Sequence, residues 1–213
     1  MIYRGLWIAI GLSRGTHDVL CSVPRGLMET EVTKKLFTVD EYYRMAEAGI
    51  LSEDSRVELI EGEIIQMSPI GRRHASCVSR ANKLFITTLG DRILLSPQNP
   101  VHLSNITELQ PAILLLKPRA DFYASKHPVA EDTYLVLEVS DTTLRYDRDR
   151  KVPLYSKSGV PEVWIEDLQA NVILVYRNPA GQCYSTSLTL HRGEQISLAA
   201  FPEITFKFDD LLG

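Results

Sequence analysis

Several features that would place this 213-residue sequence in a common functional class are missing. It has no internal repeat, no glycine-rich phosphate loop, no nucleophile elbow and no zinc-ligand spacing. Cysteine is scarce: Cys21, Cys77 and Cys183 are widely separated and form no CxxC pair, which argues against a zinc site or a redox motif. This pattern is typical of free thiols in a reducing compartment, so we expect a cytoplasmic protein.

A membrane-spanning run is also missing near the N-terminus, where the apolar stretch Leu6–Leu12 is too short to cross a bilayer. Arg14 follows it without a convincing small-residue cleavage site, so a translation start placed too far upstream is favoured over a secretory signal. Met28 opens a segment that would be a normal beginning for a soluble chain. We therefore expect residues 1–27 to be a non-core extension, residues 28–213 to form one domain, and no membrane partner.

The composition describes a globular domain with an acidic balance. Hydrophobic residues make up 45% and charged residues 23% of the sequence, which allows a sizeable core. Because the net charge is −4, a nucleic-acid partner would have to be met by a local basic patch rather than by the field of the whole protein. The candidates for such a patch, which a solvated surface would also explain, are Arg72, Arg73, Arg145, Arg148, Arg150 and Lys151.

Hydrophobic periodicity predicts alternating helices and strands. Apolar positions at helical spacing predict a main packing helix over Arg73–Leu89, and a shorter helix is expected within Phe37–Ala48. Alternation of apolar and charged residues in Arg56–Met67 predicts two strands joined by a tight turn at Glu61-Gly62. The other expected elements are a buried strand at Pro111–Leu116, a loop at Lys117–Glu131, a hairpin of Asn171–Tyr176 and Gln182–Leu190 with its turn at Asn178–Gly181, and a last strand at Ile204–Phe208.

The rest of the chain is organised around a strand–helix–strand segment. Its first strand, Tyr134–Val139, is apolar and rich in β-branched residues, yet it carries Glu138 near its end. A buried carboxylate is costly unless it is hydrogen-bonded, ion-paired or bound to metal, so Glu138 is a candidate site residue. Asp147 and Lys151 follow at helical i, i+4 spacing, before a second apolar strand at Pro161–Ile165. A purely structural ion pair between Glu138 and Lys151 would explain the pattern as well as a functional site does.

A series of short motifs gives these elements a family context. In order, they are Phe37-Thr38 with Glu41-Tyr42, Glu58-Leu59-Ile60-Glu61-Gly62-Glu63, Met67-Ser68-Pro69, His74, Gln110-Pro111, Leu137-Glu138-Val139-Ser140, Tyr146-Asp147-Arg148, Lys151, Leu154-Tyr155 and Gly159-Val160-Pro161-Glu162-Val163-Trp164. Each motif is weak alone, but the combination in this order is specific. From about Phe37 to the C-terminus, the chain resembles the Uma-type family of restriction endonucleases, which belongs to the PD-(D/E)xK nuclease superfamily.

The resemblance implies an α/β (α+β) fold: a restriction-endonuclease-like mixed β-sheet core flanked by helices, with a C-terminal β-hairpin. It also implies that Glu58 and Glu138 are catalytic and hold Mg²⁺, or Mn²⁺, and that Lys151 is the catalytic lysine, moved onto the helix after the strand. The chemistry suits these residue types. Two carboxylates bind a hard cation that polarises the scissile phosphate and lowers the pKa of the attacking water, while lysine orients that water or stabilises negative charge.

The sequence departs from the family pattern at one metal-ligand position. The family usually has aspartate directly after proline in Gln-Pro-Asp, whereas this chain has Gln110-Pro111-Ala112. A methyl group cannot bind magnesium, so at Ala112 only backbone carbonyl groups could contribute. Asp121 is expected in the following loop, and Glu108 would share the phase of Ala112 only if one strand ran unbroken through the proline.

Two functions from different classes remain open. The first is a Mg²⁺-dependent DNA endonuclease that Ala112 impairs, with His74, Arg73 and Arg148 as weaker candidates for phosphate contacts. The second is a catalytically inactive nuclease fold that binds nucleic acid or a protein partner. Superfamily members that cut both strands often act as dimers, so a homodimer is compatible with the first function, although no stretch of the sequence identifies an interface.

Overall fold

The structure is a computed structural model that describes residues 33–52 and 54–213. The predicted extension, residues 1–27, therefore lies outside the described residues. Lys35–Gly213 forms one compact unit. No helix in the described part of the chain combines the length and the apolar character that a membrane span requires.

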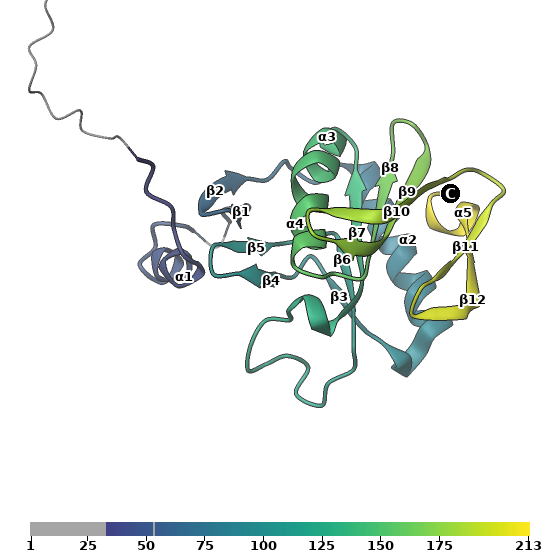
Figure 1. The fold of residues 1–213 in the computed structure, drawn as a ribbon, viewed down its shortest axis with the longest axis horizontal. Coiled ribbons are helices and arrows are strands. Elements are labelled where there is room, and N and C mark those ends of the chain that lie inside the picture. The colour runs from purple at the N-terminus through teal and green to yellow at the C-terminus, as the bar shows by residue number, and fades with distance from the viewer. Residues whose placement is uncertain (1–32, 53) are drawn as a thin grey trace, which may run out of the picture. The chain divides into compact units, whose positions relative to one another are not determined.

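The main sheet has six strands in the order β10-β9-β8-β7-β6-β3 (Figure 1). Strands β7 and β8 are parallel, since a helical segment between them returns the chain to the starting edge, whereas the other neighbours in this sheet pair antiparallel. The sheet is mixed, as predicted. Its strands are β3 (Leu94–Pro97), β6 (Ile113–Leu116), β7 (Thr133–Ser140), β8 (Glu162–Asp167), β9 (Val172–Ala180) and β10 (Cys183–Leu190).

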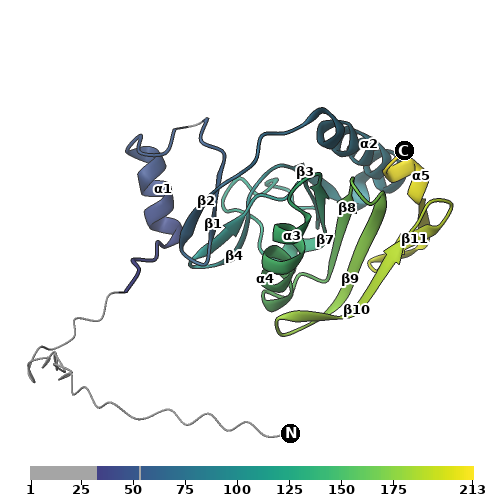
Figure 2. The same ribbon diagram turned by 90° about the horizontal axis from the view of Figure 1, so that it is seen from above.

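Helices cover both faces of this sheet (Figure 2). On one face lies α2 (Arg72–Leu89), whose residues Ala81, Phe85 and Leu89 fall at helical spacing and are buried in a cluster with Trp164. On the other face lie α3 (Leu144–Tyr146), a π-helical turn η3 (Asp147–Lys151) and α4 (Val152–Lys157), which form a second cluster with the opposite side chains of the strands. The predicted helices flanking a mixed sheet are thus confirmed.

A smaller four-stranded sheet has the order β2-β1-β5-β4. The predicted hairpin is present as β1 (Val57–Ile60) and β2 (Glu63–Gln66), and both turn residues, Glu61 and Gly62, have positive φ, as a tight hairpin turn requires. The predicted short helix is α1 (Val39–Glu47), which begins at a capping box formed by Thr38 and Glu41. The polar stretch before Gln110, for which no pairing was predicted, forms the hairpin β4 (Val101–Ser104) and β5 (Thr107–Leu109).

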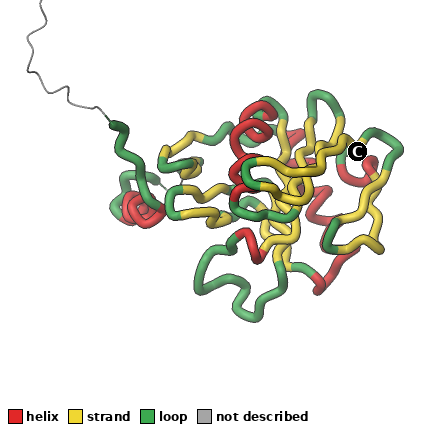
Figure 3. The backbone as a smooth tube through the Cα atoms, in the orientation of Figure 1, coloured by secondary structure: helices red, strands yellow, loops and turns green. Residues whose placement is uncertain are grey.

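The C-terminal part contains the predicted hairpin and one more. Strands β9 and β10 pair as expected, but β9 continues to Ala180, so the predicted turn at Asn178–Gly181 is wrong and the chain turns at Gly181-Gln182. A second hairpin, β11 (Gln195–Leu198) with β12 (Phe201–Lys207), and helix α5 (Phe208–Leu211) then pack beside α2. The connection from β6 to β7 is mainly loop, as predicted, apart from the short 3₁₀ helix η2 (Ala130–Asp132) (Figure 3).

One buried carboxylate belongs to the core beneath α2. Glu166 on β8 is fully buried, and burial raises its pKa to about 8 against the opposing effect of Arg80 and of the Cys77 thiol. The thiol lies near enough to lower the pKa of Glu166, yet neither carboxylate oxygen has a hydrogen-bond partner among the described residues. Glu166 is therefore protonated at neutral pH and is a target for stability measurements.

Candidate active site

A cavity of about 580 Å³ opens where the two sheets and the helical segment η3 meet. Residues from six parts of the chain contribute to its wall, from the first strand to the helical crossover. Its lining residues include Glu58, His74, Ala112, Glu138, Asp147 and Lys151. Glu58, Ala112, Glu138 and Lys151 all line this one cavity, while their roles stay predictions.

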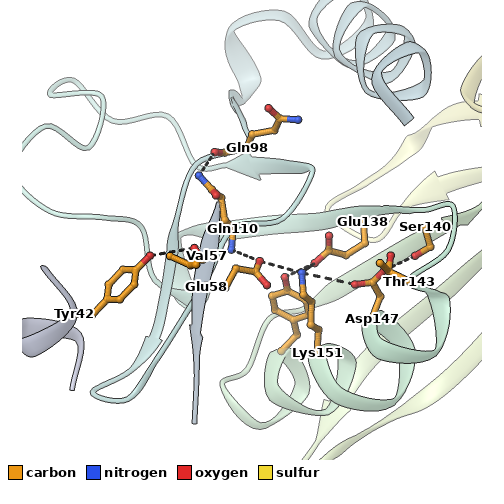
Figure 4. Close-up of polar contacts among 11 residues, drawn as sticks. Tyr42, Val57, Glu58, Gln98, Gln110, Glu138, Ser140, Thr143, Asp147 and Lys151 are labelled. Atoms are coloured by element: carbon orange, nitrogen blue, oxygen red, sulfur yellow. Dashed lines mark hydrogen bonds and ion pairs between the residues drawn. The ribbon is translucent and has the colours of Figure 1, made fainter. Parts of the chain in front are cut away.

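Lys151 is the centre of the polar contacts in this cavity (Figure 4). Its Nζ lies 3.0 Å from Glu58 Oε1, 3.4 Å from Glu138 Oε1 and 3.7 Å from Asp147 Oδ1. The side chains of all four residues are buried. One ammonium group thus binds carboxylates from β1, β7 and η3 at the same time.

Each of the first two carboxylates is also fixed by a neutral hydrogen-bond donor. Gln110 donates its backbone N–H to Glu58 Oε1 over 2.8 Å, which ties β1 to the chain just before β6. The Tyr155 hydroxyl donates to Glu138 Oε1 over 2.7 Å from α4. Because these donors come from the protein scaffold, both carboxylates are held in place by more than their ion pairs with Lys151.

The third carboxylate, Asp147, was not among the predicted site residues. Its Oδ2 accepts hydrogen bonds from Ser140 Oγ and Thr143 Oγ1, both over 2.6 Å. It begins the π-helical turn that ends at Lys151, a local irregularity often found at functional sites. The sequence did indicate that Asp147 contacts Lys151, since it stands four residues before it. That this pair also lies against Glu58 follows only from the fold.

The surplus of negative charge changes the proton affinities in the cluster. Burial raises the pKa of Glu138 to about 7; Lys151 opposes this effect, while Asp147 and Glu58 add to it. Burial alone would lower the pKa of Lys151, but the three carboxylates raise it well above its usual value. Lys151 is therefore charged at neutral pH, and Glu138 is poised to take up a proton there.

Ala112 occupies the place where a further acid would join the cluster. The register of β6 against β7 pairs Ile113 with Leu137, and continuing it by one residue sets Ala112 opposite Glu138. Side chains paired in this way have Cβ atoms about 5 Å apart. The Ala112 carbonyl already accepts the N–H of Gln98 over 3.1 Å, so the expected backbone contribution is partly used within the protein.

The two acids weighed as replacements lie elsewhere. Glu108 on β5 accepts a hydrogen bond from the Tyr43 hydroxyl and lies 3.4 Å from His102 Nδ1, while Asp121 forms an ion pair with Arg119 over 2.6 Å. Neither lines the cavity. The strand is interrupted at the proline, as expected, because β5 and β6 belong to different sheets.

The predicted phosphate contacts are brought to the cavity only in part. His74 lines it from the first turn of α2; burial lowers its pKa, with Arg56 acting in the same direction, and its Nδ1 is buried without a partner among the described residues. Arg73 donates to the Leu168 carbonyl over 2.8 Å, and Arg148 pairs with its neighbour Asp149 over 2.7 Å. Neither arginine lines the cavity, so their phosphate contacts stay predictions, whereas Arg56, which was not predicted, does line it.

The donor chemistry of the cavity fits a hard divalent cation. Carboxylate oxygens are the ligands that Mg²⁺ prefers, and one or two carboxylates suffice because Mg²⁺ keeps several waters. Within residues 33–52 and 54–213, no set of three or more His, Cys, Asp or Glu residues is arranged as a metal centre. Glu58 and Glu138, the two acids that the resemblance assigns to the metal, both line the cavity and would be the residues that hold it.

The fold of this chain is similar to that of a solved structure. A crystal structure described as "a putative nuclease belonging to DUF820" from Anabaena variabilis matches with a TM-score of 0.63 and 16% sequence identity, covering 83% of this chain and 97% of that one. At this identity the match shows the fold. No curated protein matches the sequence.

The family follows from the sequence itself. The Uma2 family, described as "Putative restriction endonuclease", matches residues 39–209. The chain belongs to this family.

Proposed function

We propose that the protein is a DNA endonuclease that hydrolyses phosphodiester bonds with Mg²⁺ or Mn²⁺, and that Ala112 impairs its activity. The observation that carries the proposal is the contact of the Lys151 ammonium with both Glu58 and Glu138 on the wall of a 580 Å³ cavity. Membership of the Uma2 family supports the reaction class, and the carboxylate pair supports the metal. DNA is the substrate that this family membership favours.

The residues of the cluster have separate tasks in this proposal. A bound divalent cation would polarise the scissile phosphate and lower the pKa of a water molecule. Glu58 and Glu138 would hold that cation, with Gln110 and Tyr155 fixing their orientation through the hydrogen bonds described above. Lys151 would donate hydrogen bonds to the attacking water or to the phosphate oxygens, since it remains charged at neutral pH.

His74 and Arg56 are placed to assist binding. Both line the cavity, and the imidazole is neutral at pH 7 because its pKa is lowered. A neutral ring offers one N–H donor to a phosphate oxygen without adding charge next to Lys151. Arg56 supplies the positive charge that an acidic protein needs locally.

A second function is favoured by one observation. Position 112, which lines the cavity beside Glu138, carries no acid, so a chain that has lost cleavage could still use the cavity to bind nucleic acid or a protein partner. The homodimer and the cytoplasmic location also stay predictions.

A plasmid-nicking assay separates the two functions. Supercoiled DNA is incubated with the unchanged protein or with Glu138→Gln in the presence of millimolar Mg²⁺ or Mn²⁺. A parallel reaction contains a chelator that removes the metal. Weak nicking that needs metal and Glu138 supports the impaired nuclease. DNA binding without any nicking, even after an acid is restored at position 112, favours the binding protein.

A further inference from the structure

Lys151 and a divalent metal would use the same two carboxylates, those of Glu58 and Glu138. The ammonium contacts Oε1 of Glu58 and Oε1 of Glu138, the two side chains assigned to the metal, and it also reaches Asp147. When all three carboxylates are ionised they carry −3, and the ammonium leaves −2, which is the charge that one divalent cation neutralises. The site thus already holds a cation, supplied by the chain itself.

The carboxylates are held in position independently of Lys151. Backbone and hydroxyl donors fix each of them: Gln110 for Glu58, Tyr155 for Glu138, and Ser140 with Thr143 for Asp147. Lysine, by contrast, reaches the cluster on a flexible four-carbon stem. The part of this cluster that can most easily move is therefore the ammonium group.

We propose that Lys151 is an exchangeable counter-ion that competes with the metal for Glu58 and Glu138, so that metal binding must push the ammonium out of the carboxylate cluster. This inference rests on the proposed function. Two cations held at contact distance by the same pair of buried carboxylates would repel each other strongly. Displacement would also place the ammonium in the cavity beside the metal, where a phosphate would lie.

Competition between Lys151 and the metal predicts an effect on metal affinity that a lysine acting only on substrate would not have. Removing the ammonium should tighten metal binding, because the carboxylates no longer have to release a bound cation. A lysine that acts only on substrate would leave metal affinity unchanged. The resting protein should also depend on this ammonium, since without it three buried carboxylates have no positive partner in the cluster.

The test is isothermal titration calorimetry with Mn²⁺ alone, on the full chain and on Lys151→Met, which replaces the apolar stem of the side chain and removes the ammonium group. We expect Lys151→Met to lower the Kd for Mn²⁺ by about tenfold or more, the factor that corresponds to one lost competing ion pair. Thermal unfolding supplies a second readout: Mn²⁺ should raise the Tm of Lys151→Met more than that of the unchanged protein. Lys157→Met, the same substitution at an exposed position of α4, is the matched control and should behave like the unchanged protein.

Each outcome decides between the proposals. Equal or weaker Mn²⁺ binding by Lys151→Met, with binding by the unchanged protein, overturns the exchange and leaves the proposed function standing. No Mn²⁺ binding by either protein removes the metal site and with it the proposed function. If Lys151→Met does not fold, Lys151→Gln is measured instead, and failure of both to fold even with Mn²⁺ would show that metal cannot replace the ammonium, which also overturns the proposal.

Discussion

Restoring an acid at position 112 is the perturbation with the largest expected effect on function. Ala112 is only 5% exposed, lines the cavity and stands opposite Glu138 when the β6–β7 register is continued. An aspartate there would have its Cβ atom about 5 Å from the Cβ atom of Glu138 and would add a carboxylate to the cluster. We therefore expect Ala112→Asp to raise metal affinity and to create or strongly increase metal-dependent cleavage.

The cost and its recovery can be worked out from the site. A buried carboxylate beside three others should lower the free energy of unfolding by roughly 2–4 kcal/mol when no metal is added. For a unit of this size, such a loss lowers Tm by roughly 4–16 °C. Metal at about 100 times its Kd returns about 2.7 kcal/mol, so most of the loss should be recovered on addition of Mg²⁺ or Mn²⁺.

The assay combines thermal unfolding with plasmid nicking, each with and without metal. We expect at least about a 100-fold gain in nicking rate, because changes to residues that merely support a metal site already alter activity by 10–100-fold. Ala112→Asn is the matched control, since it adds nearly the same volume without the charge. Glu138→Gln or Lys151→Ala in the Ala112→Asp background should abolish the gain.

Three results would refute this reasoning. Robust cleavage by the unchanged protein would show that the acid is dispensable. An Ala112→Asp protein that folds and binds Mg²⁺ but never cuts DNA would favour the non-catalytic binding function. Equal activity of the aspartate and asparagine variants would show that packing, and not a metal ligand, is what position 112 supplies.

Three further predictions concern stability. The pKa of Glu166 is about 8 when folded and near 4.5 when unfolded, so the folded state holds the extra proton and this group should lower stability by about 2–3 kcal/mol from pH 5.5 to 7.5 in urea titrations. Glu138, whose pKa is raised to about 7, acts in the same direction, so Glu166→Gln should make the fall smaller without abolishing it, and an equally steep fall in Glu166→Gln would contradict the prediction. Tyr155→Phe removes a donor to Glu138 and should cost about 1–3 kcal/mol by the same method, so an unchanged urea midpoint would show that the hydrogen bond is not needed. A chain that starts at Met28 should melt within about 2 °C of the full chain, whereas a drop of many degrees would assign residues 1–27 to the core.

Local features of the site could be predicted because they are short-range. The apolar run around Glu138 determines a buried strand, and the spacing of Asp147 and Lys151 determines that they meet on a helix. Glu58 became a candidate only through the resemblance to the Uma-type family, because no local pattern in the sequence indicates its contact with Lys151. Position 112 was marked by the missing acid alone.

Long-range features depended on packing that no sequence period reports. Glu58 and Lys151 are separated by 93 positions in the chain and meet only because β1 and η3 pack at one cavity. The polar stretch of β4 and β5 forms a hairpin although its own alternation is poor, and β5 pairs on its other side with β1 through Leu59 and Glu108.

The sequence by itself therefore determined which residues are candidates and what kind of element carries each one. Tertiary structure alone decided that Asp147 joins the cluster and that Gln110 and Tyr155 fix its carboxylates. It also decided that Arg73 and Arg148 bind Leu168 and Asp149 and do not line the cavity. The physical reason is that propensity and periodicity act over a few residues, whereas sheet register and helix packing set which distant side chains share one buried space.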